Sequence, residues 1–362
     1  MLGNDIMNIT IVLPGIQNRP TGGSKIVFEY ITRLISKHSG LFVTLCYWDQ
    51  MKTGKISLVP LPRRIKLVLC RIATRWEPRW FALPKSVQKR FVTAIDDASI
   101  PDADWVFATA AVTAPGVHAL SSSKGRKGYL IQGYETWDMP EERLRKTYRY
   151  RMENVVIAHW LKDLVDSATG GDCTCIPNPV DTEVFHPDKR FVRDPLRVSV
   201  LYHPSEHKGF QYAWEAIEKA HEAVPDLRVS MFGTYAPPKG LPSWVEYMRN
   251  AGSEDLRRIY STSAIFVCAS VNEGYGLTCV EAMACGCSLV VTDFAGSREY
   301  AKQGESALVA PVGDVDAIAE NIVRLLEDAS LRESLGKAGM ETARSLSWDK
   351  AIERFEEVLG LV

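Results

Sequence analysis

The chain has 362 residues, 46% of them hydrophobic, and its 43 Lys and Arg residues balance 44 Asp and Glu residues. At about 150 residues per domain, this length favours two domains with ordinary cores. The balanced charge leaves no global field that would attract nucleic acid. The sequence shows neither an apolar run of the roughly eighteen residues that a spanning helix needs nor the pattern of a signal peptide. We therefore expect a cytoplasmic protein, with the residues before Met7 as an upstream extension.

Short apolar runs alternate with helix-like segments along almost the whole chain, a pattern typical of parallel sheets covered by helices. In the first half the pattern predicts a helix over 24–37 and strands at 9–13, 42–47, 105–109, 128–131 and 155–158. In the second half it predicts strands at 198–202, 227–232, 264–269 and 288–292, and helices at 210–223, 255–261, 277–284, 315–327, 329–345 and from 348. Residues 176–195, rich in proline and charge, are the best candidate for a linker between the two halves.

This organisation predicts an α/β protein with two Rossmann-like domains. Residues 1–185 are expected to form the N-terminal domain and residues 186–346 the C-terminal domain, followed by a last helix over 347–362.

The segment from Ala264 to Cys285 has the layout of a ligand site in a parallel sheet. A strand ends at Ser270, a loop carries Gly274 and Gly276, and a helix begins near Leu277, followed by the hydroxyl of Thr278. In open parallel sheets, ligands bind beyond the carboxyl ends of the strands, where free amides and the helix dipole favour an anion such as a diphosphate. The glycines let the backbone approach that ligand closely.

Two carboxylates flank this loop. Glu273 lies in the loop and Glu281 lies just over one turn inside the helix, so both can face one cleft. Carboxylates accept hydrogen bonds from vicinal hydroxyls, so one can hold a ribose and the other a hexose. An isolated pair of this kind is more often a solvated loop residue and an acid stabilised by the helix dipole. The surrounding glycines and apolar residues favour a nucleotide-sugar site.

The segment EGYGLTCVE resembles the Glu-x7-Glu motif of retaining glycosyltransferases of family 4, which have the GT-B fold. The resemblance extends over nearly the whole chain, through TGGSKIVFEYITRL, VIAHWLKDLV, IPNPVDTEVFHP and HKGFQYAWEAI. It implies two parallel sheets facing across a cleft, with the acceptor on the side of residues 1–185 and the nucleotide sugar bound by residues 186–346, and with the helix over 347–362 crossing back to the first domain. It also implies that Glu281 holds the ribose and that Glu273 lies near the transferred sugar. Backbone groups of Gly274, Tyr275, Gly276 and Leu277 would line the sugar and the diphosphate. The family also implies retention of configuration without a metal or other cofactor.

Lys208 precedes the predicted helix that begins at Phe210, where a positive charge is unfavourable unless an anion binds. The resemblance implies that Lys208 neutralises the leaving diphosphate together with an arginine five residues earlier. That position holds His203 in this chain. Because histidine titrates near neutral pH, His203 either donates a hydrogen bond without a full charge or the phosphates are held differently.

The first domain contributes two further groups of candidates. Gly22 and Gly23 precede its first helix and are expected near the donor phosphates, with a tight turn that binds no ligand as an equal alternative. After a predicted strand end, the acceptor-side candidates are Gln132, Tyr134, Glu135 and Trp137. Many family members carry histidine where this chain has Gln132. A subgroup that makes rhamnose-containing polysaccharides has a similar glutamine and tyrosine, which favours dTDP-rhamnose as donor over UDP- or GDP-hexoses.

Residues 63–90 contain nine Lys or Arg residues, one acid and interleaved aromatic residues. This composition suits peripheral contact with an anionic membrane or a polyprenyl-diphosphate acceptor, although a solvated helical surface is the commoner case. The run ERLRKTYRYR is a second, weaker candidate for the same role.

The sequence as a whole predicts a hexosyltransferase of cell-surface polysaccharide biosynthesis, such as lipopolysaccharide, that uses a saccharide or lipid-linked saccharide acceptor. Two other readings stay open: another enzyme of similar fold, such as a nucleotide-sugar epimerase, and a noncatalytic module that binds sugar nucleotides or glycans. A dehydrogenase is disfavoured because no GxGxxG follows the first strand.

Overall fold

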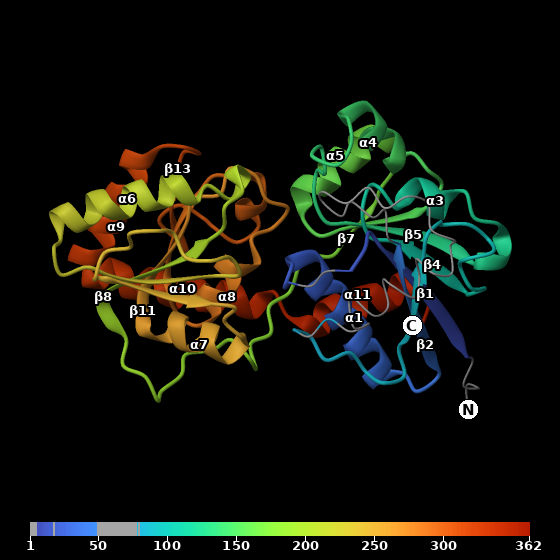
Figure 1. Ribbon diagram of the computed structural model, residues 1–362, viewed down its shortest axis with the longest axis horizontal. Coiled ribbons are helices and arrows are strands. Elements are labelled where there is room, and N and C mark those ends of the chain that lie inside the picture. The colour runs from blue at the N-terminus through green and yellow to red at the C-terminus, as the bar shows by residue number, and fades with distance from the viewer. Residues whose placement is uncertain (1–5, 17–18, 49–77, 79) are drawn as a thin grey trace. The chain divides into compact units, whose positions relative to one another are not determined.

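The computed structural model describes residues 6–16, 19–48, 78 and 80–362 (Figure 1). The chain forms two compact units, Met1–Ile176 with Ile352–Val362, and Pro177–Ala351. The boundary falls earlier than the one placed at 185/186 from the sequence, because the segment after Ile176 packs in the second unit. Its Val180 amide donates to the Leu346 carbonyl at 2.9 Å. Further along, the Phe185 ring lies 6.3 Å from that of Tyr260.

The first unit contains a sheet of seven described strands in the order β3-β2-β1-β4-β5-β6-β7, and all its pairings are parallel. The strands are β1 (Met7–Leu13), β2 (Leu41–Trp48), β3 (Gln88–Val92), β4 (Trp105–Ala108), β5 (Arg126–Ile131), β6 (Glu153–Val156) and β7 (Thr174–Cys175). The α-helices are α1 (Gly22–Lys37), α3 (Ala114–His118), α4 (Glu141–Tyr148), α5 (His159–Thr169) and, from Ile352 onward, the C-terminal α11 (Trp348–Leu359).

The second unit contains a six-stranded parallel sheet in the order β10-β9-β8-β11-β12-β13. Its strands are β8 (Asp194–Tyr202), β9 (Arg228–Gly233), β10 (Val245–Arg249), β11 (Ser263–Cys268), β12 (Ser288–Thr292) and β13 (Ala307–Ala310). Its α-helices are α6 (Phe210–Ala223), α7 (Ser253–Thr262), α8 (Leu277–Ala284), α9 (Val315–Glu327) and α10 (Ala329–Ser345).

The central strands of the second sheet are buried along almost their whole length. Every residue of β12 is buried, and in β11 only the terminal Cys268 is partly exposed. Strands covered by helices on both faces read as continuous apolar runs, which is why the sequence identifies them. In both sheets the first strand along the chain lies at the point where strand order reverses, between β1 and β4 and between β8 and β11. Crevices at such points are where α/β proteins bind ligands.

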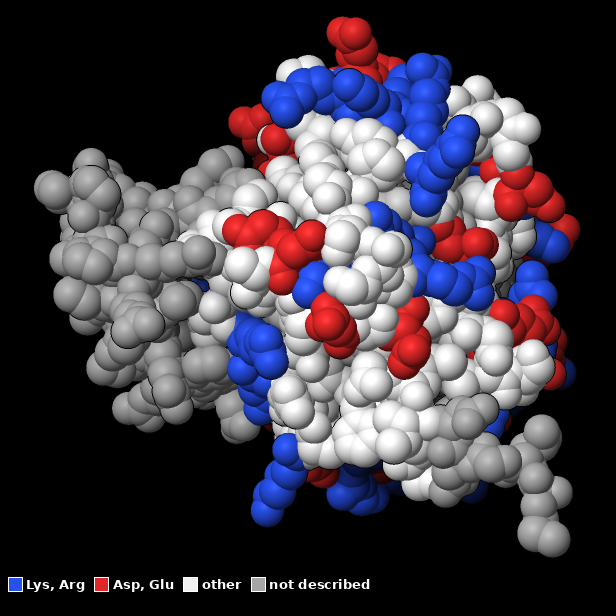
Figure 2. Space-filling model, turned by 90° about the vertical axis from the view of Figure 1, so that its right-hand side faces the viewer, with Lys and Arg blue, Asp and Glu red and all other residues white. Residues whose placement is uncertain are grey.

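Two predictions about membrane contact bear on the first unit. Most of the basic stretch 63–90 lies outside the described residues. The run ERLRKTYRYR forms α4 and the residues after it, and Figure 2 shows Lys and Arg side chains along the upper edge of this face. Within α4, acids occupy the first turn and bases the last turn, as the helix dipole favours on any solvated helix. No helix in the described part of the chain has the length and apolar character of a membrane span.

The end of the chain is anchored in the first unit by Glu356 of α11. The Glu356 carboxylate is fully buried and accepts hydrogen bonds from Lys37 Nζ at 2.7 Å and from His38 Nε2 at 2.6 Å. Phe355, beside it, packs its ring 4.8 Å from Tyr30. Burial opposes ionisation of Glu356, but the bonds from Lys37 and His38 outweigh it, so the pKa of Glu356 is lowered.

We expect Glu356→Gln to lower the free energy of unfolding by about 1–3 kcal/mol at neutral pH, because a charge-assisted pair is lost. A carboxylate whose folded pKa is lowered adds stability above its unfolded pKa, and this stability disappears as pH falls through the folded value. The difference from wild type, measured by urea unfolding, should therefore shrink as the solution is acidified. Glu353→Gln, at an exposed position of α11, is the matched control. Equal losses in both variants would contradict the anchoring role.

Candidate functional site

The candidate site lies at the carboxyl ends of β8 and β11, the adjacent parallel strands at the point where strand order reverses. Residues 203–209 connect β8 to α6, and residues 269–276 connect β11 to α8. Both helices begin after a glycine with positive φ, Gly209 at 58° and Gly276 at 92°. Among the described residues, no side chain caps either helix. Two helix N-termini with free amides therefore converge on one edge of the sheet.

Close backbone packing holds these two loops together. A Cβ atom on Gly209 would overlap the carbonyl oxygen of Ala269, so only glycine fits there. The carbonyl of His207 accepts from the Val271 amide at 2.9 Å and the Asn272 amide at 3.2 Å. The loops are thus fixed to each other by main-chain contacts that do not depend on side-chain conformation.

The far side of the 269–276 loop is fixed by residues after β12. The Tyr300 hydroxyl donates to the Tyr275 carbonyl at 3.0 Å. A Cβ on Gly296 would lie 2.7 Å from the Gly274 carbonyl oxygen, so this contact also requires glycine. These supports place the backbone of Gly274 and Tyr275 while the Tyr275 side chain stays buried.

Lys208 and Glu273 meet at the centre of the site. Lys208 Nζ lies 2.9 Å from Glu273 Oε2, and both side chains are largely screened from solvent, at 26% and 13% exposure. The other carboxylate oxygen of Glu273 accepts from the Ser270 hydroxyl. The ammonium therefore stands at a positive helix terminus with a carboxylate as its partner, an arrangement that suits exchange of that carboxylate for a bound anion.

His203 stands beside this pair as a neutral imidazole. Its Nδ1 accepts from the Ser205 amide at 3.1 Å, which leaves Nε2–H as the donor. Its ring packs edge-on against Tyr235 with centroids 5.0 Å apart. Burial, followed by the charge of Lys208 and by His207, lowers the pKa of His203, while Glu273 acts in the opposite direction.

The remaining predicted donor residues lie on α8. Leu277 and Thr278 form its first turn and are partly exposed, whereas the Glu281 side chain is only 6% exposed. Burial raises the pKa of Tyr260 well above its usual value, and the charge of Glu281 raises it further. Glu273 lies in the loop before α8 and Glu281 lies within α8, and they differ in access, because the Glu281 side chain is buried.

In the first unit, the predicted glycines and Gln132 meet at the corresponding edge of the sheet. Gly22 and Gly23 begin α1, which follows β1. A Cβ on Gly23 would lie 3.2 Å from the amide end of Gln132, so these two residues are neighbours. Gln132 Nε2 reaches the Thr109 carbonyl at 3.5 Å, and its Oε1 is buried without a hydrogen-bond partner among the described residues.

The other acceptor-side candidates follow Gln132 but differ in exposure. The Glu135 carboxylate accepts from the Ala111 amide at 2.6 Å and is only 9% exposed. The pKa of Glu135 is raised to about 7, because burial and the charge of Asp138, which raise it, outweigh the Ala111 hydrogen bond, which lowers it. Trp137 is 61% exposed, and the ring of Tyr134 lies 5.9 Å from the guanidinium of Arg145. Glu135 therefore holds the backbone after β4, while Trp137 offers an open aromatic surface.

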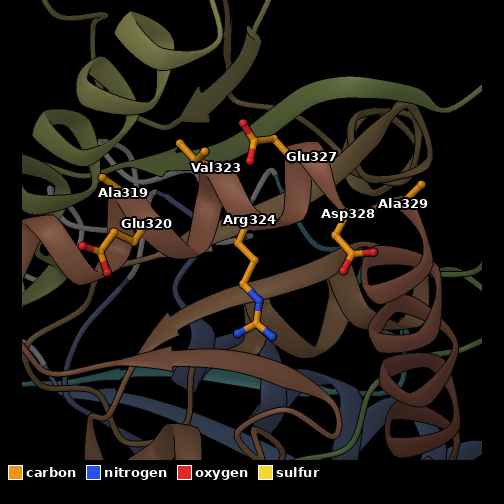
Figure 3. Close-up of a pocket in the computed structure, with 7 residues that line it drawn as sticks. All are labelled: Ala319, Glu320, Val323, Arg324, Glu327, Asp328 and Ala329. Carbon is orange, nitrogen blue, oxygen red and sulfur yellow. The ribbon is translucent and has the colours of Figure 1, made fainter.

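An open depression elsewhere in the second unit shares no residue with the predicted site (Figure 3). It runs along α9 to the start of α10 and is lined by Ala319, Glu320, Val323, Arg324, Glu327, Asp328 and Ala329. In the close-up, Arg324 points away from Glu327, and Asp328 caps α10 by accepting from the Leu331 amide at 2.9 Å. Its polar groups do not converge, so it lacks the character of a specific site.

Residues 195–328 match the family model described as glycosyl transferases group 1, and this range contains both loops of the site. The matched range is little more than a third of the chain and lies within the second unit. The chain is 37% identical over 106 residues to the O-antigen chain mannosyltransferase B of Escherichia coli, which is 29% of this chain and 27% of that protein. It is 25% identical over 206 residues to a phosphatidyl-myo-inositol mannosyltransferase of Mycobacterium leprae, or 54% of this chain and 55% of the relative. The chain thus spans about half, or less, of the length of these curated relatives.

Solved structures match this chain over both units. Sucrose-phosphate synthase from Thermosynechococcus elongatus has a TM-score of 0.73 at 16% identity, with 98% of each chain covered. HepE from Anabaena, in complex with UDP and glucose, also has a TM-score of 0.73, at 13% identity, with 98% of this chain and 100% of that one covered. The predicted α/β fold of GT-B glycosyltransferases is confirmed. The expected cleft between the sheets stays a prediction.

We expect Gly209→Ala to destabilise the second unit by at least about 3 kcal/mol, since the new methyl group must displace the backbone of Ala269, just after β11. Gly240→Ala is a matched control, because Gly240 also has a positive φ, 74°, but has nothing within 4 Å of its added Cβ. The control should lose only about 1–2 kcal/mol, the cost of the left-handed backbone. Urea unfolding of both variants separates the two contributions, and similar losses would show that the loop contact carries little energy.

Proposed function

We propose that this protein transfers a sugar from a nucleotide-diphosphate donor to a saccharide or lipid-linked saccharide acceptor. The observation that carries the proposal is the Lys208–Glu273 pair, 2.9 Å apart, at the strand-order reversal between two helix N-termini. A diphosphate needs positive charge and backbone donors, and a sugar needs a carboxylate for its hydroxyls. The two loops supply the positive charge of Lys208 and the carboxylate of Glu273 side by side. The group 1 match supports the same function and does not favour an epimerase or a noncatalytic module.

Lys208 and Glu273 pair with each other in the structure, and in the proposed complex the donor gives each of them a new partner. The diphosphate takes Lys208, together with the amides at the start of α6 and α8. Glu273, released from Lys208, then accepts hydrogen bonds from hydroxyls of the transferred sugar, and Ser270 keeps the carboxylate in place. Glu281 holds the ribose. Positive charge fixed in advance where the leaving diphosphate gains negative charge lowers the barrier to its departure.

Transfer then proceeds with retention of configuration. The bond between the anomeric carbon and the diphosphate oxygen breaks as the acceptor hydroxyl attacks on the same face, and the leaving phosphate oxygen accepts the hydroxyl proton. Glu273 orients the sugar and forms no covalent bond. Lys208 performs the charge neutralisation that a metal ion performs in other transferases, so we propose a reaction that needs no metal.

The donor and the place of action belong to the same proposal. Gln132 favours dTDP-rhamnose, with UDP- and GDP-hexoses as the other candidates, and the acceptor binds near Gln132, Tyr134, Glu135 and Trp137. The two mannosyltransferase relatives support a role in polysaccharide or glycolipid synthesis. We propose that the enzyme acts in the cytoplasm at the inner face of the membrane, with residues 63–90 as the contact.

The proposal is tested by measuring hydrolysis and transfer with dTDP-rhamnose, UDP-glucose and GDP-mannose. We expect turnover with one donor and at least a tenfold fall in rate for Lys208→Ala, because the leaving diphosphate loses its cation. Lys219→Ala is the matched control, since Lys219 lies on the surface of α6 and pairs with Asp316 of α9, away from the site. Binding without turnover would favour the module, and epimerised donor would favour the epimerase. Unchanged turnover in folded Lys208→Ala would remove Lys208 from the site.

Glu273→Gln tests the division of roles between the two carboxylates. The amide keeps the shape of the side chain but loses the negative charge that makes the carboxylate a strong acceptor of hydrogen bonds from hydroxyl groups. We expect turnover to fall by about tenfold or more while affinity for the nucleoside diphosphate changes little. Steady-state kinetics and calorimetry with the free nucleotide measure these quantities separately. A parallel loss of both would place Glu273 on the nucleotide instead of the sugar.

A further inference from the structure

A second histidine stands in the same loop as His203, at a position to which the sequence assigned no role. His207 lies in the turn before Lys208, and its ring centroid is 6.2 Å from that of His203. The His207 backbone is fixed by the Val271 and Asn272 amides, so its position relative to Glu273 is set by the main chain. His203 is half-buried and His207 is exposed at the rim. The two imidazoles thus flank the approach to the Lys208 ammonium.

The groups that face these histidines form a small and balanced set. Lys208 and His207 lie in the same loop as His203, Glu273 comes from the loop after β11, and Tyr235 comes from the loop after β9. Lys208 and Glu273 cancel each other at 2.9 Å. Burial and Lys208 lower the pKa of His207, against the effect of Glu273, as they do for His203. With both histidines neutral, this set of five residues carries no net formal charge.

We propose that His203 and His207 bind the donor diphosphate together, and that the pair takes up a proton from solvent as the donor binds. This inference rests on the proposed function. A bound diphosphate brings negative charge to the two rings whose protonation Lys208 now opposes, so it stabilises the imidazolium form. At His203 the new proton goes to Nδ1, which then releases the Ser205 amide. That amide becomes a further donor for the phosphate oxygens, and no covalent bond of the donor changes.

Proton uptake and donor affinity are linked. If binding takes up a proton, donor affinity must rise as pH falls, by up to about tenfold per pH unit for each proton. An arginine at position 203 would supply the charge at every pH and show no such dependence. The histidine pair therefore makes the donor site respond to pH in the range where imidazoles titrate.

The test is calorimetric binding of the donor found in the turnover assay to the full chain. A nucleotide sugar is used instead of a nucleoside diphosphate, because a terminal phosphate titrates near pH 6 itself. Titrations near pH 6.5 in two buffers of different ionisation enthalpy give the number of protons taken up. We expect a fraction of a proton to be taken up, and affinity to rise several-fold between pH 8 and pH 6.

Three variants locate the effect. His203→Arg should bind the donor with a weaker pH dependence, and the double variant His203→Gln, His207→Gln should take up no proton. His159→Gln, at an exposed position in the first unit, should behave as wild type. Binding by wild type without proton uptake, or uptake retained in the double variant, would overturn the inference and leave the transferase proposal standing. Failure of every nucleotide sugar to bind at either pH would overturn both.

Discussion

The contact between Gly209 and the Ala269 carbonyl is the constraint on which the site depends. It brings the residue before α6 so close to the residue after β11 that position 209 has no room for a Cβ atom. Because the strands β8 and β11 are neighbours, the loops that follow them meet in a fixed register. Lys208 and Glu273 can then pair at 2.9 Å although 64 residues, 209–272, lie between them in the chain. The geometry of the charges is therefore a consequence of backbone packing.

The sequence predicted best those elements whose signals are local. The helices Phe210–Ala223 and Leu277–Ala284 have the predicted bounds, because each follows a glycine and presents an apolar face. It missed β3, β7, β10 and β13, which are short strands. In the edge strand β10, no residue is fully buried and the sequence VEYMR lacks an apolar run. Such strands are defined by the partner that they pair with, and a single sequence does not reveal that partner.

In the candidate site, too, the sequence signals some residues locally, while the contacts between them depend on the fold. Lys208 and Glu273 were each identified from a loop that precedes a helix, but their pairing depends on strand order, which the sequence does not give directly. Tyr300 and Gly296, which support the Glu273 loop, lie after the next strand and carry no local signal. His207 had one available signal, its place between His203 and Lys208 in a loop already suspected of binding phosphate. The sequence thus proposed the residues of the site, and the fold shows the contacts that support them.

The ion pair between Lys208 and Glu273 also bears on which ligands the site accepts. A lysine at a helix N-terminus is unfavourable alone, and Glu273 removes that cost before any ligand binds. An anion that takes Lys208 must therefore compete with Glu273 and leave it without its cation. Inorganic phosphate offers nothing in return, because it repels a carboxylate. A nucleotide sugar offers the anion to Lys208 and hydroxyl donors to Glu273 in one molecule, so under the proposed function the pair selects for the complete donor over its separate parts.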